Sequence, residues 1–121
     1  MEYSDNKPIY MQIVDYFCEQ ILKKEWTAED RIPSVREVAI KMEVNPNTAM
    51  RAFHYLQEEG VLYNQRGVGY FVAAGAFEKV RELKREEFIK QKLPVFFKDM
   101  KQLGFTCTEL EKLYDTDLKD R

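Results

Sequence analysis

The most informative hydrophobic pattern in the chain lies in residues 33–60, where apolar positions recur at helical spacing. Residues at i, i+3, i+4 and i+7 share one face of a helix. One such stripe consists of Val35, Val38, Ala39 and Met42. A second consists of Ala49, Ala52, Phe53 and Leu56. The pattern therefore predicts two short amphipathic helices in close succession.

Polar residues mark the ends of these two helices. Ser34 can cap the first helix, and residues 43–45 form the predicted turn. Asn45 can cap the second helix, and Pro46 suits its first turn because the N–H that proline lacks would be unpaired there. Gly60 is expected to end it. Two helices joined by a tight turn are the plan of a helix-turn-helix motif.

A preceding helix is predicted from about Pro8 to Lys24, after a loose arm at residues 1–7. Its apolar face is broad enough to meet two neighbours and contains Ile9, Tyr10, Ile13, Val14, Tyr16 or Phe17, Ile21 and Leu22. Arg31 and Ile32 are candidates for a very short strand.

The periodicity changes after Gly60 from helical to strand-like. Residues 61–66 and 70–73 are two β-prone runs, and Gly67, Val68 and Gly69 form a glycine-rich tip between them. This arrangement predicts a β-hairpin. A hairpin directly after a helix-turn-helix is a wing, so the fold class is expected to be mainly α with a small β-hairpin wing.

The region from residue 76 to Gly104 is predicted to be helical, and Pro94 should bend or split it near residues 91–93. Thr106 and Glu109 form a capping box for a last helix, and the tail at residues 117–121 is expected to fray.

The C-terminal helices have an apolar face that a single copy of so short a region cannot cover. Its residues are Phe88, Leu93, Phe96, Phe97, Met100 and Leu103. A face of this kind needs a partner, and a second copy of the chain is the expected one. We therefore predict a winged helix-turn-helix DNA-binding domain at residues 1–74 and a helical dimerisation region at residues 75–121.

Composition restricts the function without deciding it. The chain has 121 residues, of which 45% are hydrophobic and 33% charged, as in a globular protein. Its net charge of −2 hides an uneven distribution, because residues 73–104 have eight Lys and Arg against five Asp and Glu. Charge alone neither establishes nor excludes binding to DNA. Without a membrane-length apolar run or a signal peptide, a cytoplasmic protein is expected.

No arrangement of side chains suggests catalysis or a metal site. His54 is the single histidine, and it falls mid-helix as a surface or interface residue. Cys18 and Cys107 are far apart and expected to be reduced thiols, so no zinc-spaced cluster exists. The Gly67–Gly69 segment lacks the Lys-Ser/Thr of a phosphate loop. We therefore expect neither an enzyme nor a cofactor.

Polar residues around the two helices and the wing fit binding to double-stranded DNA. Short polar side chains at the start of the second helix suit the major groove, where Asn can pair with adenine and Thr can meet a phosphate or a thymine methyl. The helix N-terminus itself favours a phosphate. Arg36 and Arg51 could clamp the DNA backbone, and Arg66 could reach the minor groove. The candidate set is Ser34, Arg36, Asn45, Pro46, Asn47, Thr48, Arg51, Arg66 and Gly67.

Four segments together resemble the winged-helix domain of the GntR family: Ile32–Ala39, Val44–Phe53, Glu59–Val61 and Gln65–Val72. The Asn-Pro-Asn-Thr turn and the short C-terminal region resemble the YtrA subfamily. The resemblance implies a dimeric bacterial transcription regulator, usually a repressor, that binds a palindromic operator. In this subfamily the regulated genes often encode ABC-type transporters. It assigns DNA contacts to Arg36, to residues 45–48, and to Arg66 and Gly67.

Three positions depart from the family pattern. Many members have arginine where this chain has Pro46 and Met50, and a small residue such as threonine where it has Tyr70. The family's base preference therefore does not transfer, and we expect base contacts from the asparagines and Thr48 and phosphate contact from Arg51. An alternative function is a winged-helix adaptor that binds protein, through its helical tail, instead of specific DNA.

Overall fold

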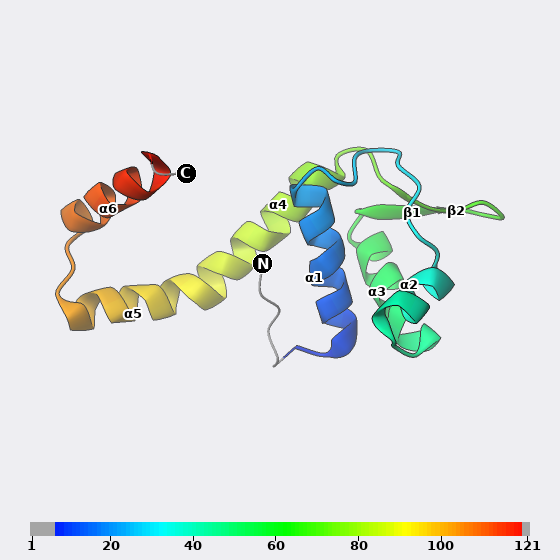
Figure 1. Cartoon of the computed structure of the whole chain (residues 1–121), viewed down its shortest axis with the longest axis horizontal. Helices are drawn as coiled ribbons and strands as arrows, with labels where there is room; N and C mark the ends of the chain where they lie inside the picture. Colours follow the sequence, from blue (N-terminus) through cyan, green and yellow to red (C-terminus); the bar gives the residue numbers. More distant parts are fainter. Residues whose placement is uncertain (1–6, 120–121) are drawn as a thin grey trace. The chain divides into compact units, whose positions relative to one another are not determined.

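The computed structural model describes residues 7–119, so the predicted loose arm, apart from Lys7, lies outside the described residues. The elements in chain order are α1 (Ile9–Leu22), α2 (Val35–Met42), α3 (Pro46–Glu58), β1 (Leu62–Gln65), β2 (Gly69–Val72), α4 (Ala76–Glu87), a π-helical turn (Phe88–Lys92), α5 (Leu93–Leu103) and α6 (Cys107–Lys119) (Figure 1). The predicted fold class, helical with a hairpin wing, is confirmed. The chain divides into two compact units, one ending at Leu83 and the other beginning at Lys84.

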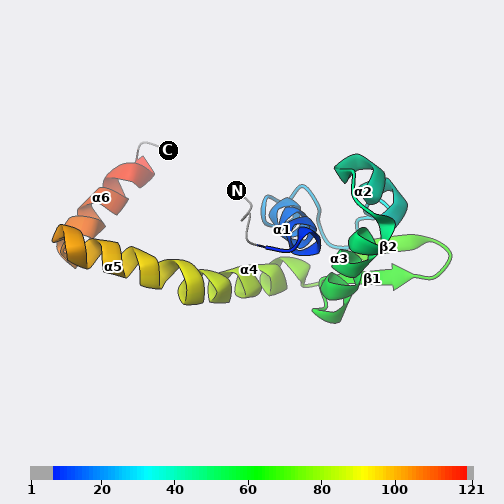
Figure 2. The same ribbon diagram turned by 90° about the horizontal axis from the view of Figure 1, so that it is seen from below.

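The core of the first unit is built around Phe53 of α3, whose side chain is fully buried. Helix α3 packs against both α1 and α2 (Figure 2). The Phe53 ring meets Phe17 of α1 at 5.2 Å between centroids and Tyr70 of β2 at 4.8 Å, both edge to face. Such pairs add stability beyond the area they bury. One side chain thus joins the first helix, the third helix and the wing.

Both predicted helix starts in the motif are confirmed. Ser34 and Glu37 form a capping box at the start of α2, with Ser34 Oγ accepting from Glu37 N and Glu37 Oε1 accepting from Ser34 N, each at 3.1 Å. Helix α2 ends at Met42, and Glu43 caps it with left-handed backbone geometry. Asn45 caps α3, and Pro46 occupies its first turn. Both predicted apolar stripes face the core.

The wing hairpin pairs Leu62 with Val72 and Gln65 with Gly69 in antiparallel register. Its tip is a turn closed by a hydrogen bond of 2.9 Å from Val68 N to Gln65 O, and Gly67 supplies the φ of +79° that its third position needs. The predicted strand at Arg31 and Ile32 exists as an isolated bridge from Arg31 to Phe71 of β2.

Some predictions about the flanking helices need correction. Ile9 was placed on the apolar face of the first helix, yet it is 56% exposed because it lies in the first turn of α1, beyond the reach of the core. Helix α6 continues to Lys119, so the first three residues of the tail predicted to fray are helical in the structure, and its last two lie outside the described residues. The fraying itself remains a prediction. Ala76 and Val80 of α4 are buried in the core of the first unit. The predicted functional boundary at residues 74 and 75 remains a prediction.

Pro94 has the predicted effect on the long C-terminal helix. The α-helical pattern gives way to the π-helical turn at Phe88–Lys92, and α5 begins again at Leu93 with the proline in its first turn. Proline cannot donate to the preceding turn, and its ring displaces the carbonyl that would accept. The second capping box is also confirmed, because Thr106 Oγ1 accepts from Glu109 N at 3.1 Å.

Truncation of the central aromatic ring should destabilise the first unit. We expect Phe53→Ala to lower the free energy of unfolding by about 3–5 kcal/mol, since it removes a fully buried ring and leaves a cavity. Urea denaturation followed by far-UV circular dichroism measures this change. Ile40→Ala, at a position 70% exposed, serves as the control and should shift stability by about 0.5 kcal/mol or less. Equal effects of the two changes would contradict the central role of Phe53.

The α2 capping box should make stability depend on pH. Hydrogen bonds from Ser34, backbone first and then side chain, lower the pKa of Glu37, and the charge of Arg31 adds to this effect. A carboxyl with a lowered pKa stabilises the folded state above its unfolded pKa and loses that contribution as pH falls through the folded value. The melting temperature of wild type should therefore exceed that of Glu37→Gln near neutral pH, and the difference should shrink between about pH 7 and about pH 3.

The exposed Glu58 of α3 provides the matched control for this experiment. If Glu58→Gln reproduces the pH-dependent difference, then the effect comes from net charge rather than from the capping box.

Candidate nucleic-acid interface

The predicted DNA-binding residues all lie in the first unit, at the starts of α2 and α3 and on the wing. The starts of α2 and α3 and the wing lie on the same side of α1 (Figures 1 and 2). Arg36 is exposed in the first turn of α2, and Arg66 and Gly67 are exposed at the wing tip. The fold therefore brings together segments that are about thirty residues apart in the sequence.

At the start of α3 the backbone amides are already paired. Asn45 Oδ1 accepts from Asn47 N at 2.7 Å, and the carbonyl oxygen of Asn45 accepts from Thr48 N at 2.9 Å and from Ala49 N at 3.1 Å. Pro46 has no N–H. This helix start thus has no unpaired amide that could attract the expected phosphate. Any contact made here must come from side chains.

Asn45 and Asn47 differ in what their side chains can offer. The side-chain oxygen of Asn45 is engaged in the cap, whereas both polar atoms of Asn47 are exposed and have no partner among residues 7–119. Bidentate pairing with adenine needs an acceptor and a donor together. Asn47 is therefore the better placed of the two for reading a base, and Thr48, which is half-buried, lies beside it.

At the start of α2 the situation is reversed. Ser34 Oγ is used as a cap acceptor, but the N–H groups of Val35 and Arg36 have no partner in the described part of the chain. Free amides at a helix start attract anions. The Arg36 side chain lies in the same turn, so α2 presents a cation and two donors together.

Arg51 is held by a contact that the sequence did not reveal. Its guanidinium lies over the ring of Tyr10 from α1, at 4.0 Å from the centroid. A cation over an aromatic face is stabilised by the ring quadrupole. Its predicted contact with a phosphate remains a prediction.

A second arginine, Arg31, lies against the wing, and it is not among the predicted DNA contacts. The side chain of Arg31 lies so close to Gly69 that a Cβ there would be 3.1 Å from Arg31 Nε. Residues 29–32 run along β2, with Ile32 N donating to Tyr70 O at 3.0 Å and Val72 N donating to Asp30 O at 2.9 Å. The connector between α1 and α2 (residues 23–34) is therefore joined to the hairpin by backbone hydrogen bonds. Only the predicted short strand at Arg31 hinted at this pairing.

The outer face of the wing has a stacked pair, Tyr63 and Phe71, with centroids 5.5 Å apart. The Tyr63 hydroxyl donates to Glu29 Oε2 of the connector, and this hydrogen bond raises the pKa of Tyr63. The hydroxyl therefore stays protonated as a donor, and the connector has a second link to the wing.

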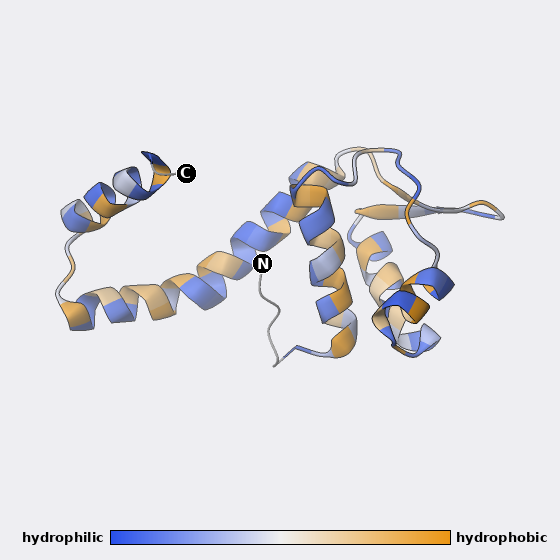
Figure 3. Ribbon diagram, in the orientation of Figure 1, coloured by the Kyte–Doolittle hydropathy of each residue, from blue (hydrophilic) through white to orange (hydrophobic). Residues whose placement is uncertain are grey.

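The predicted dimerisation residues lie in the second unit without cover from their own chain. Phe88, Phe96, Phe97 and Leu103 are exposed, with Leu103 at 71%, while Leu93 and Met100 are half-buried. Hydrophobic and hydrophilic stripes alternate along α5 (Figure 3). A shallow apolar hollow in this unit is lined by residues that include Phe88, Leu93 and Phe96.

Three further observations concern metal ligands, helix length and the single histidine. Among residues 7–119 there is no group of three or more His, Cys, Asp or Glu that could hold a metal ion. In the same range, every helix is too short or too polar to span a bilayer. Within the described chain His54 is exposed on α3, as expected of a surface histidine.

Comparisons with known proteins agree with this geometry. The family of bacterial regulatory proteins called gntR matches residues 9–72. The HTH-type transcriptional repressor YtrA of Bacillus subtilis is 36% identical over 108 residues, which is 89% of this chain and 80% of that protein.

Solved structures agree as well. A GntR-family structure from Bacteroides thetaiotaomicron has a TM-score of 0.79 and 42% identity over 93% of this chain and 98% of its own. The AraR DNA-binding domain, solved in complex with the operator ORR3, has a TM-score of 0.55 and 26% identity over 60% of this chain and 88% of its own. The protein thus belongs to the GntR family of bacterial regulatory proteins, DNA-binding regulators of transcription rather than enzymes.

Proposed function

We propose that this protein is a cytoplasmic repressor that binds a palindromic operator as a homodimer and controls nearby genes, among them ABC-transporter genes. The observation that supports this most directly is the cluster of exposed Arg36, Asn47 and Arg66 on three elements of one winged helix. The repressor YtrA, which resembles this chain over most of its length, supports the sign of regulation.

Different side chains contact the phosphates and the bases of the operator. Arg36 neutralises a backbone phosphate, and the free amides of α2 donate hydrogen bonds to it. Arg51, whose guanidinium lies over the Tyr10 ring, binds a second phosphate. Asn47 and Thr48 read base edges in the major groove. Arg66, at the tip of the wing beside Gly67, enters the neighbouring minor groove. Ser34 and Asn45 act mainly by fixing the helix starts, and Pro46 by shaping the turn.

The homodimer is supported by the apolar face of the second unit. Exposed aromatic side chains at Phe88, Phe96 and Phe97 would be costly in water, and a two-fold axis lets the same face cover itself. Two winged-helix domains related by such an axis would bind DNA half-sites about 34 Å apart. A palindromic operator follows from the same symmetry.

DNA binding can be tested by fluorescence anisotropy with the region upstream of the protein's own gene, titrated at several salt concentrations. We expect Arg36→Ala with Arg66→Ala to weaken binding by tenfold or more, because one cation is lost at the backbone and one in the minor groove. The slope of log K against log salt should fall by about 2. The control is Arg81→Ala, which removes an exposed cation from α4.

In the same titration Asn47→Ala should behave differently. It should lower affinity for the upstream region by about 1–3 kcal/mol and leave binding to unrelated DNA almost unchanged. Absence of salt-dependent binding by the wild-type protein would reject the proposal and favour the protein-binding adaptor.

The dimer can be tested by light scattering coupled to size-exclusion chromatography. We expect Phe96→Glu, and likewise Met100→Glu, to give monomers with weaker operator binding, because a charge would be buried in the apolar face. Lys98→Glu introduces the same side chain at an exposed polar position of α5 and should leave the dimer intact. A Phe96→Glu protein that is still dimeric would place the interface elsewhere.

A further inference from the structure

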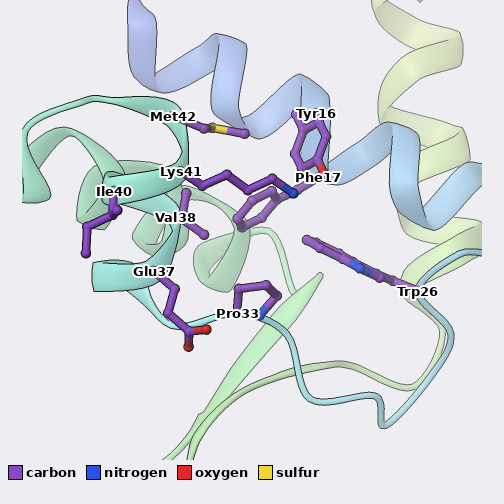
Figure 4. A pocket seen from close by; sticks show the side chains of 9 residues that line it. All are labelled: Tyr16, Phe17, Trp26, Pro33, Glu37, Val38, Ile40, Lys41 and Met42. Carbon is purple, nitrogen blue, oxygen red and sulfur yellow. The ribbon is translucent and has the colours of Figure 1, made fainter.

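A pocket of about 450 Å³ lies in the first unit, beside the start of α2. It opens between the second half of α1, the connector before α2, and α2 itself (Figure 4). None of the nine candidate DNA-binding residues lines it. Ligand sites in proteins commonly have volumes of about 300–1,000 Å³ and mostly apolar walls with few polar groups. We propose that this pocket binds a small aromatic carboxylate.

The floor of the pocket is an aromatic cluster. Trp26 from the connector meets Phe17 at 5.0 Å and Tyr16 at 6.3 Å between ring centroids, both edge to face. Tyr16 and Trp26 are half-buried, so part of each ring remains accessible. Aromatic rings stack or pack edge to face with one another, and a planar ring is therefore the group that best fits this floor.

Aliphatic side chains complete the walls. Pro33 and Val38 lie at the base of α2, and Ile40 stands at the rim (Figure 4). Ile40 is 70% exposed, although the rest of the exposed α2 surface is polar. A ring seated in the pocket would shield part of this side chain from water, which favours binding.

The charge of the ligand follows from Lys41. Its ammonium lies 5.7 Å from the centroid of the Tyr16 ring and faces the pocket (Figure 4). In the described part of the chain no carboxylate forms an ion pair with Lys41. Lys41 is exposed, so an anionic group on the ligand can pair with it at the mouth of the apolar site.

The nearby carboxylate does not change this conclusion. Glu37 also lines the pocket, but its Oε1 accepts from the backbone N–H of Ser34 in the capping box. In Figure 4 this carboxylate points away from Lys41 and the aromatic floor. The cation is therefore directed at the pocket and the anion is committed elsewhere, so a carboxylate ligand is favoured over an amine.

The inference can be tested on the full-length wild-type protein without any DNA. Trp26 is the only tryptophan in the chain, and its fluorescence reports on this pocket and on a second hollow that it lines together with Lys24 and Phe77. The Lys41→Met variant distinguishes the two, because Lys41 lines only the first. The probes are phenylacetate, 2-phenylethylamine and 2-phenylethanol, which share a ring and differ in charge. We expect saturable quenching by phenylacetate with a Kd on the order of 1 mM or tighter, as befits so small a ligand. The amine and the alcohol should bind at least fivefold more weakly.

Lys41→Met keeps the side-chain stem and removes the charge. It should weaken phenylacetate binding at least fivefold, whereas Lys79→Met, at an exposed lysine of α4, should not. Circular dichroism checks that both variants are folded, and isothermal calorimetry gives a second measure of binding. The proposal is overturned by three results: no saturable binding, equal binding by Lys41→Met, or equal or tighter binding of the amine or alcohol. None of these results bears on whether the protein binds DNA.

Discussion

The winged helix of the first unit depends on the packing of one aromatic ring. Phe53 is fully buried and contacts Phe17 on one side and Tyr70 on the other. These three residues come from α1, α3 and β2. The orientation of α3 and that of the wing are therefore set by the same contact. A small residue at position 70, as the family pattern would have it, could not make this contact. Tyr70 thus appears in the sequence as a departure and in the structure as part of the core.

The wing is more firmly attached than a two-stranded hairpin would be on its own. An isolated hairpin is marginally stable in water. Here residues 29–32 hydrogen-bond along β2, Arg31 lies against Gly69, and the Tyr63 hydroxyl binds Glu29. The connector therefore acts as a brace for the wing. It also contains Trp26, which forms part of the pocket, so the wing and the pocket share one supporting segment.

Features set by neighbours in the sequence could be predicted, and features set by distant contacts could not. The α2–turn–α3 motif follows from local signals, namely an apolar stripe, a capping Ser34 and Asn45, and Pro46. The hairpin and the capping box at Thr106 also follow from local signals. The cation–π contact of Arg51 with Tyr10 joins residues 41 positions apart, and no periodicity in the sequence reveals it. The burial of Val80 and the pocket beside Trp26 likewise depend on how separate helices meet.

The cap at the start of α3 has a consequence for how such a regulator can change its target. Asn45 holds the helix start through its side-chain oxygen, so its replacement would affect folding and recognition together. Asn47 carries no such duty among the described residues. Substitution at position 47 therefore removes no helix cap, whereas position 45 is constrained by the stability of the fold. Two identical amino acids, two residues apart, would then evolve at different rates.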